Sequence, residues 1–130
     1  MKRYALILLF LVLLFAGQTA AQGGKAEPKP ITMSAAKSGT VLAGMLRHGE
    51  EMEYTFTGRK DEIAVFANSN TSLFDVRVFD PESGFDTEYD SSRTFDVDLP
   101  DTAEYVIFIR RKVGGPRSAR FRVSFRVQRP

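Results

Sequence analysis

The sequence contains no cysteine, no tryptophan and one histidine, His48, in 130 residues. Without cysteine the chain has no disulfide bond, no thiol nucleophile and no site for lipid attachment to cysteine. One histidine cannot supply the several nitrogen or sulfur ligands of a zinc site. His48 stands beside Gly49 in a predicted turn, and no serine lies in a recognisable nucleophile motif. We therefore expect a protein that is not an enzyme, needs no cofactor and is held together by core burial alone.

Long hydrophobic runs are also lacking after the N-terminus. Lys2 and Arg3 precede an apolar run over residues 4–16, which is followed by small residues up to Ala21. This order predicts a secretory signal peptide over residues 1–21, with Gln22 as the new N-terminus, and an uncleaved anchor is the alternative. We expect an exported protein, periplasmic or secreted, that has no membrane anchor after cleavage.

The balance of charge limits the partners. Two of the 18 basic residues and none of the 16 acidic residues lie in the predicted signal peptide, so the mature chain has no net charge. A globally basic nucleic-acid-binding protein is therefore disfavoured, and the sequence has no basic helix or aromatic RNA-binding motif. We expect no nucleic-acid partner.

The mature chain divides into two parts. Residues 22–38 are rich in Gly, Pro, Lys and Ala, which predicts a flexible tether. From residue 39 to residue 130, short apolar runs alternate with polar residues and are separated by turn residues. The clearest pair is a hairpin of residues 105–109 and 119–127, in which every second residue is apolar. The pattern predicts an all-β binding domain, a jelly-roll-like antiparallel β-sandwich of about seven to eight short strands.

The sign of the charge changes abruptly near Tyr105. Residues 74–104 contain ten acidic and two basic residues, whereas residues 105–130 contain eight basic residues and no acid. Several of these cations fall in the predicted hairpin connection, residues 110–118. Either they pair with the neighbouring carboxylates, or they form a docking surface, because guanidinium groups bind carboxylates in bidentate fashion. We predict a partner-binding site made of Arg110, Arg111, Lys112, Arg117 and Arg120.

The acidic segment could serve a second purpose. Carboxylates follow one another closely after the predicted strand over residues 74–79, and oxygen ligands of this kind suit Ca²⁺. The spacing does not match that of a helical calcium-binding loop, so a solvated acidic loop is the alternative. The candidate residues are Asp80, Glu82, Asp86, Glu88 and Asp90.

Four motifs occur in an order that resembles the bacterial pre-peptidase C-terminal domain. They are GTVLAGML over residues 39–46, EYTFT over 53–57, FDVRVFDPESG over 74–84 and LPDTAEYVIFI over 99–109. The resemblance covers nearly all of residues 39–128. It implies a secreted β-sandwich of the kind appended to exported enzymes.

A standalone sandwich with an arginine-rich connection before its last strand also resembles the periplasmic inhibitors of g-type lysozyme. This resemblance implies that surface loops insert into the cleft of a lysozyme, with Arg110, Arg111 and Arg117 in the inserted loop. It also matches the segment Ala119-Arg120-Phe121 to the small-x-aromatic start of the last strand. A protein partner, such as a lysozyme or another enzyme that degrades the cell wall, is the expectation.

A module that binds cell-wall glycan, a polymer or another exported protein is the alternative function. Glycan binding generally uses aromatic rings as stacking platforms, and tryptophan is absent. The candidate platforms are Phe79, Phe85 and Tyr89, unless these rings are buried in a second layer.

Overall fold

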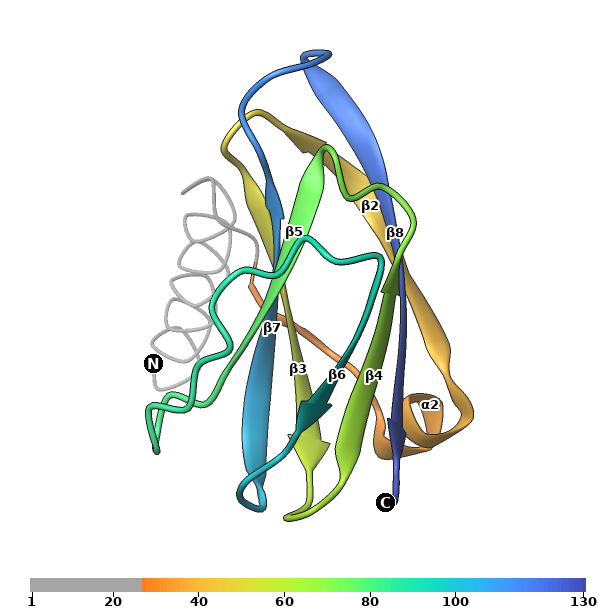
Figure 1. Ribbon diagram of the computed structural model, residues 1–130, viewed down its shortest axis with the longest axis vertical. Coiled ribbons are helices and arrows are strands. Elements are labelled where there is room, and N and C mark those ends of the chain that lie inside the picture. Colours follow the sequence, from red (N-terminus) through yellow and green to blue (C-terminus); the bar gives the residue numbers. More distant parts are fainter. Residues whose placement is uncertain (1–26) are drawn as a thin grey trace, which may run out of the picture.

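The computed structural model describes residues 27–130. The predicted signal peptide and residues 22–26 of the predicted tether lie outside the described residues. The described chain contains one short helix and eight strands (Figure 1). Their bounds are β1 Lys29–Pro30, α2 Met33–Ser38, β2 Thr40–Arg47, β3 Glu51–Gly58, β4 Ile63–Asn68, β5 Phe74–Phe79, β6 Thr94–Asp98, β7 Ala103–Arg111 and β8 Ser118–Gln128. No helix within residues 27–130 is long and apolar enough to cross a membrane.

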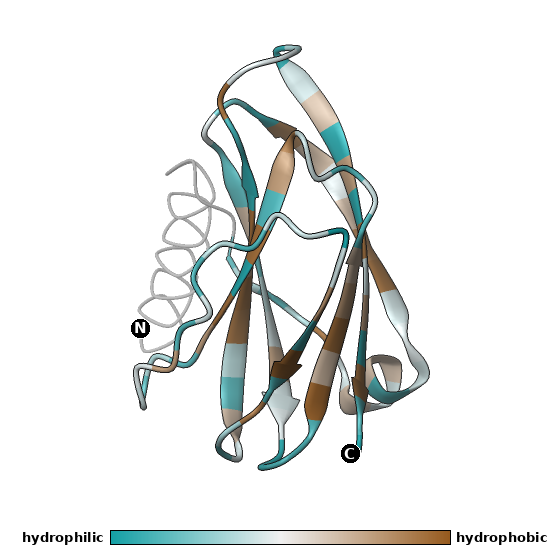
Figure 2. Cartoon of the chain, in the orientation of Figure 1, coloured by the Kyte–Doolittle hydropathy of each residue, from teal (hydrophilic) through white to brown (hydrophobic). Residues whose placement is uncertain are grey.

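The strands form two four-stranded sheets packed face to face, which confirms the predicted all-β sandwich. Sheet A has the order β1-β3-β7-β5, and sheet B has the order β2-β8-β4-β6. All the pairings are antiparallel except that of β1 with β3. Apolar residues gather in the strands, and most connecting loops are hydrophilic (Figure 2). A single sheet would leave its apolar face in water, and the second sheet covers it.

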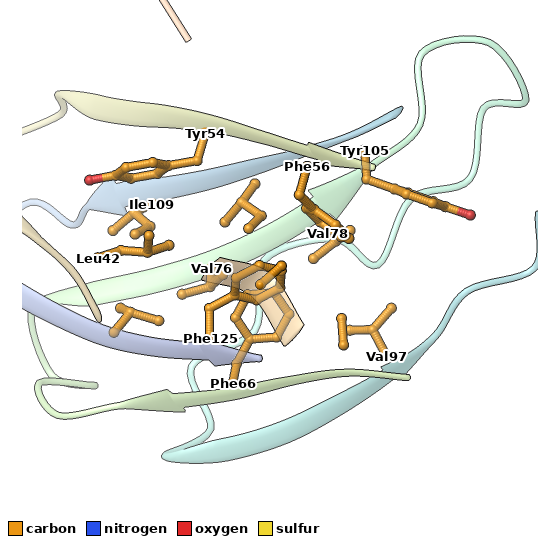
Figure 3. Close-up of a cluster of buried hydrophobic side chains, with 14 of the residues drawn as sticks. Leu42, Tyr54, Phe56, Phe66, Val76, Val78, Val97, Tyr105, Ile109 and Phe125 are labelled. Atoms are coloured by element: carbon orange, nitrogen blue, oxygen red, sulfur yellow. The ribbon is translucent and has the colours of Figure 1, made fainter. Parts of the chain in front are cut away.

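The period-two alternation of the sequence determines which side chains enter the core. In β8 the aromatic and aliphatic residues Phe121, Val123, Phe125 and Val127 are buried, and the polar residues between them are exposed. The ring of Phe125 lies 4.8 Å from that of Phe56 in sheet A and 5.1 Å from that of Phe66 in sheet B. The contact between Phe125 and Phe56 joins the two layers (Figure 3), and burial of such rings contributes most of the hydrophobic stabilisation.

Residues 27–38, the described part of the predicted flexible tether, are folded onto the sandwich, so the prediction is wrong for these residues. Residues 29–30 pair with β3, and α2 packs against the sandwich with Ala36 only 2% exposed. The Thr32 hydroxyl accepts a hydrogen bond from the Ala35 amide at 3.2 Å and so caps the helix. A six-residue helix is too short to show a helical period, so its composition alone suggested a linker.

The acidic segment between β5 and β6 does not project into solvent as an open loop. It folds back along the free edge of β5, where Asp90 bridges to Val76 and Asp86 bridges to Phe79. The amide of Val76 donates to the Asp90 carbonyl at 3.0 Å, and the return bond measures 2.8 Å. The edge of sheet A is therefore covered, which protects an otherwise unpaired strand.

Candidate binding site

The connection between β7 and β8, residues 112–117, lies at one end of the sandwich beside the β2–β3 turn (Figure 1). We call it the tip loop. Its base is held on two sides, since the Gly49 amide donates to the Arg111 carbonyl at 3.1 Å and the Lys112 amide donates to the Leu73 carbonyl at 2.9 Å. The ring nitrogen Nε2 of His48 is 3.1 Å from the Gly115 carbonyl oxygen. The lone histidine thus helps to position the tip loop.

Arg111 is the internal anchor of this loop, and its prediction as a partner-binding residue is wrong. Its side chain is 0% exposed. The guanidinium donates to the carbonyl oxygens of Gly114 at 2.9 Å and Pro116 at 2.6 Å, and also to that of Lys112. One guanidinium therefore supplies hydrogen bonds to three loop carbonyls that would otherwise bind water. Of its three nitrogens, only the buried Nε atom has no acceptor among the described residues.

Arg110 lies on the outer face of sheet A, whereas its neighbour Arg111 faces inward. Arg110 is not a free cation either. Its Nε and Nη2 atoms donate to the two carboxylate oxygens of Asp75 at 3.1 and 2.6 Å. Its guanidinium carbon lies 3.7 Å from the centre of the Tyr89 ring. The hydrogen bonds that Arg110 donates to Asp75 raise the pKa of Arg110 above its ordinary value. Arg110 is therefore not the unpaired cation that the sequence suggested, because its guanidinium already binds a carboxylate of its own chain.

The remaining predicted cations are accessible. Lys112 is half-buried, and its Nζ donates a hydrogen bond to the Thr71 carbonyl at 2.9 Å. Arg117 and Arg120 are exposed, and within residues 27–130 neither guanidinium lies in a hydrogen bond or an ion pair. Arg117 belongs to the tip loop, whereas Arg120 lies on β8 and faces outward from sheet B. The structure does not gather the five predicted residues into one site.

Sequence reasoning missed Val113, which is 85% exposed at the tip loop. Together with Gly49, Arg110, Arg111 and Lys112 it lines a shallow pocket of about 280 Å³. A single valine in a glycine-rich connection gives no periodic signal, so only the fold shows that it protrudes. An exposed aliphatic side chain beside a cation is an arrangement suited to protein contact.

The candidate calcium ligands make hydrogen bonds within the acidic segment and to β5. Asp80 is buried, and its carboxylate accepts hydrogen bonds from the Ser83 hydroxyl at 2.6 Å and the Glu82 amide at 3.0 Å. These bonds lower the pKa of Asp80. Asp86 accepts two hydrogen bonds from Arg77, at 2.8 and 2.6 Å, which lower its pKa.

The other members of that set do not converge on a common centre. Asp90 accepts a hydrogen bond from the Ser92 amide at 2.7 Å, and Glu82 and Glu88 are exposed. Within the described part of the chain, no group of three or more His, Cys, Asp or Glu side chains is arranged to hold a metal ion. The acidic residues therefore shape the loop that covers β5.

The candidate sugar platforms are half-buried rings that contact their own protein. Phe85 packs edge-on against Tyr105 with centroids 6.2 Å apart, and Phe79 lies 6.5 Å from Phe108. Tyr89 lies against Arg110, and its hydroxyl donates to Glu51 at 2.9 Å. Each of these rings therefore has contacts within its own protein and remains partly exposed.

No protein-family model and no curated protein sequence matches the chain. Solved structures with the same fold do exist. PliG of Salmonella Typhimurium, a periplasmic lysozyme inhibitor of g-type lysozyme, has a TM-score of 0.58 and 16% identity over 77% of this chain and 98% of its own. PliG of Aeromonas hydrophila has a TM-score of 0.56 and 17% identity over 78% of this chain and 97% of its own.

The pre-peptidase C-terminal domain of a collagenase from Bacillus anthracis is also similar. It has a TM-score of 0.53 and 15% identity, covering 78% of this chain and 95% of its own. Both resemblances inferred from the sequence motifs are thus confirmed at the level of the fold. The chain has the β-sandwich fold found in PliG inhibitors and in a pre-peptidase C-terminal domain.

Proposed function

We propose that this chain is an exported, non-catalytic binding protein that inhibits a g-type lysozyme through its tip loop. The fold shared with PliG supports the choice of partner. The predicted signal peptide over residues 1–21 supports export. The tip loop replaces the wider arginine cluster expected from the sequence, since Arg110 and Arg111 are engaged within the molecule.

The observation that carries the proposal is the preordered loop built on Arg111. Three carbonyl groups of the loop accept hydrogen bonds from one buried guanidinium, so the loop has its shape before a partner arrives. A segment ordered in advance loses less conformational entropy on binding than a flexible one. Val113 at the loop surface would then enter a cleft as an aliphatic contact.

Charge gives the loop a preferred kind of cleft. Lys112 and Arg117 are the cations that remain at the tip, and glycosidase clefts contain catalytic carboxylates. Complementary charge accelerates encounter and fixes orientation. The loop is therefore expected to block substrate access, with Lys112 and Arg117 close to the carboxylates of the lysozyme.

The test is an inhibition assay with purified residues 22–130 and a g-type lysozyme, following the clearing of a bacterial cell suspension. Equimolar protein should suppress the lysozyme, and the Val113→Asp and K112E/R117E variants should need at least about tenfold more protein for the same effect. The R59E/K60E variant is the matched control, because it reverses two exposed charges in the β3–β4 turn at the opposite end (Figure 1). Full lysozyme activity with excess folded protein would contradict the proposal.

The same preparation also tests the alternative of a glycan-binding module. Retention of the protein on insoluble peptidoglycan at 1 M salt would support that module over an electrostatic inhibitor, since salt screens exposed charge. Export has its own readout, which is a mature N-terminus at Gln22 in protein recovered from outside the cytoplasm.

A further inference from the structure

The outer face of sheet B carries a row of arginines that the tip-loop function does not use. Along β8, Arg120, Arg122 and Arg126 all face outward, because the residues between them in the alternation are buried. In the ladder Arg120 stands opposite Met45, Arg122 opposite Ala43 and Arg126 opposite Val65. Each of these cations is therefore flanked by a small or aliphatic side chain on a neighbouring strand.

The surface around these arginines is hollowed along the strand. Three shallow depressions of about 330, 280 and 500 Å³ follow one another over sheet B. The first two share Val41, Ala67 and Ser124, and the last two share Arg122, so they form one continuous trough. We call this trough the sheet B furrow. Ala43, Ala67 and Ser124 have side chains too small to fill it.

The charges of the furrow are open to a partner. Within the described residues, the guanidinium groups of Arg93, Arg120 and Arg122 lie in no ion pair and no hydrogen bond, and that of Arg126 donates only to Gln128 at 2.9 Å. Asp96 and Asp98 lie on the same side of the sheet, but on edge strand β6, with β4 between them and β8. On sheet A the situation differs, since Arg77 and Arg110 each bind a carboxylate at 2.6 Å.

The floor of the furrow is aliphatic rather than aromatic. Val41 is 45% exposed and Met45 is 54% exposed, both on β2. The aromatic residues of sheet B, such as Phe66, Phe121 and Phe125, are buried and face the core. Sugars and nucleobases bind proteins largely by stacking on rings, whereas an aliphatic floor suits peptide side chains.

We propose that the sheet B furrow binds an extended acidic peptide segment of a protein partner. Side chains on one face of an extended chain recur about every 6.8 Å, which is the spacing of outward residues along β8. Carboxylates at positions i, i+2 and i+6 of the peptide would lie opposite Arg120, Arg122 and Arg126. An apolar side chain between the second and third carboxylates would lie over Ser124 and Ala67, whose small side chains leave room for it. The binding motif is thus two acids in alternation, an apolar residue and a third acid, all on one face.

The probe is a fluorescein-labelled peptide of nine residues with Glu at positions 2, 4 and 8, Leu at position 6 and Ser elsewhere. Titrated with residues 22–130 and followed by fluorescence anisotropy, it should bind saturably. Its Kd should rise at least about tenfold for R120Q/R122Q, while R59Q/K60Q, which removes the same charge at the far end of the sandwich, should bind as the parent does. Circular dichroism and thermal unfolding confirm that both variants fold.

The register and the class of ligand are tested with two further ligands. A peptide of the same composition with the second Glu moved from position 4 to position 3 places that carboxylate on the opposite face, and it should bind at least about tenfold more weakly. Equal binding of the two peptides would overturn the register. Displacement of the parent peptide by inorganic polyphosphate at lower concentration than by unlabelled peptide would overturn the peptide assignment in favour of an anionic polymer. Unchanged binding by R120Q/R122Q would overturn the site itself.

This inference is independent of the tip-loop proposal. The R120Q/R122Q variant should inhibit a g-type lysozyme as the parent does, and K112E/R117E should bind the acidic peptide as the parent does. Loss of lysozyme inhibition in R120Q/R122Q with peptide binding unchanged would contradict the assignment of both surfaces. If the parent does not inhibit the lysozyme, the tip-loop proposal fails, and the peptide titration still tests the furrow by itself.

Discussion

Arg110 and Asp75 form a bidentate ion pair on the outer face of sheet A, with distances of 3.1 and 2.6 Å between the guanidinium nitrogens and the carboxylate oxygens. They are 35 residues apart in the sequence and stand opposite each other in the β5–β7 ladder. The Asp75 side chain is 4% exposed and that of Arg110 is 43% exposed. The pair shows how a charge that looks available in the sequence is used internally.

Replacement of Asp75 by Asn should destabilise the protein by about 1–2 kcal/mol, because charge-assisted hydrogen bonds become weaker and Arg110 loses its partner on one side. Urea unfolding at pH 7 measures the change. A double-mutant cycle with Arg110→Gln isolates the pair, and its coupling energy should be positive. A coupling energy of zero would mean that the contact adds nothing to stability.

Arg111→Met should destabilise the protein by about 2–3 kcal/mol, because three carbonyl groups at the tip loop lose their buried donor. Methionine keeps the aliphatic stem, so the loss reports on hydrogen bonding more than on packing. Amide hydrogen exchange should accelerate in residues 112–117 and remain slow in β3 and β5. Uniform acceleration over the whole sandwich would contradict a local role for Arg111.

Gly58→Ala should destabilise the protein by about 1–3 kcal/mol through overpacking. A Cβ atom at Gly58 would overlap Leu99 Cδ1 and lie 3.2 Å from Cε2 of the Tyr105 ring, and both of these residues are in the buried core. Thr57→Ala is the matched control, since Thr57 is the exposed neighbour on β3 and its loss should change stability by less than about 0.5 kcal/mol. Equal thermal unfolding midpoints for the two variants would contradict this prediction, because they would mean that the core rearranges to accommodate the added methyl group.

Stability should fall on the acid side. The pKa values of Asp80 and Asp86 are lowered in the folded protein, by hydrogen bonds from Ser83 and Arg77 respectively. A carboxylate of this kind contributes stability above its unfolded pKa, about 3.9, and loses that contribution as the pH falls through the lower folded pKa. Urea midpoints should therefore be constant between pH 7 and 5 and decrease below about pH 4.

The cause of the shift can be isolated with Ser83→Ala. Removal of the hydroxyl that donates to Asp80 at 2.6 Å should move the pKa of Asp80 upward, as followed by NMR titration of its carboxyl carbon. Titration of Asp86, which owes its lowered pKa mainly to Arg77, should remain unchanged in this variant. An Asp80 titration identical to that of the parent would contradict the assigned cause.

Part of the site could have been derived from the sequence. Tyr105, Ile107 and Ile109 alternate as inward residues of β7, and the same parity places Arg111 inward and Arg110 outward once the strand is extended by two residues. The predicted strand ended at Ile109 because a run of three cations resembles a loop. In the structure the three carbonyls of the tip loop make the buried position of Arg111 possible.

The alternation of apolar and polar residues by itself determined the sandwich and the residues that face its core, because a strand repeats every two residues wherever it is placed. The fate of the charges was decided only by the tertiary structure. Whether an arginine is paired depends on which distant strand becomes its neighbour, as Asp75 does for Arg110 through the β5–β7 ladder. Arg120 and Arg122 of β8 lie instead beside the small and aliphatic side chains of β2, so their charges remain open to solvent.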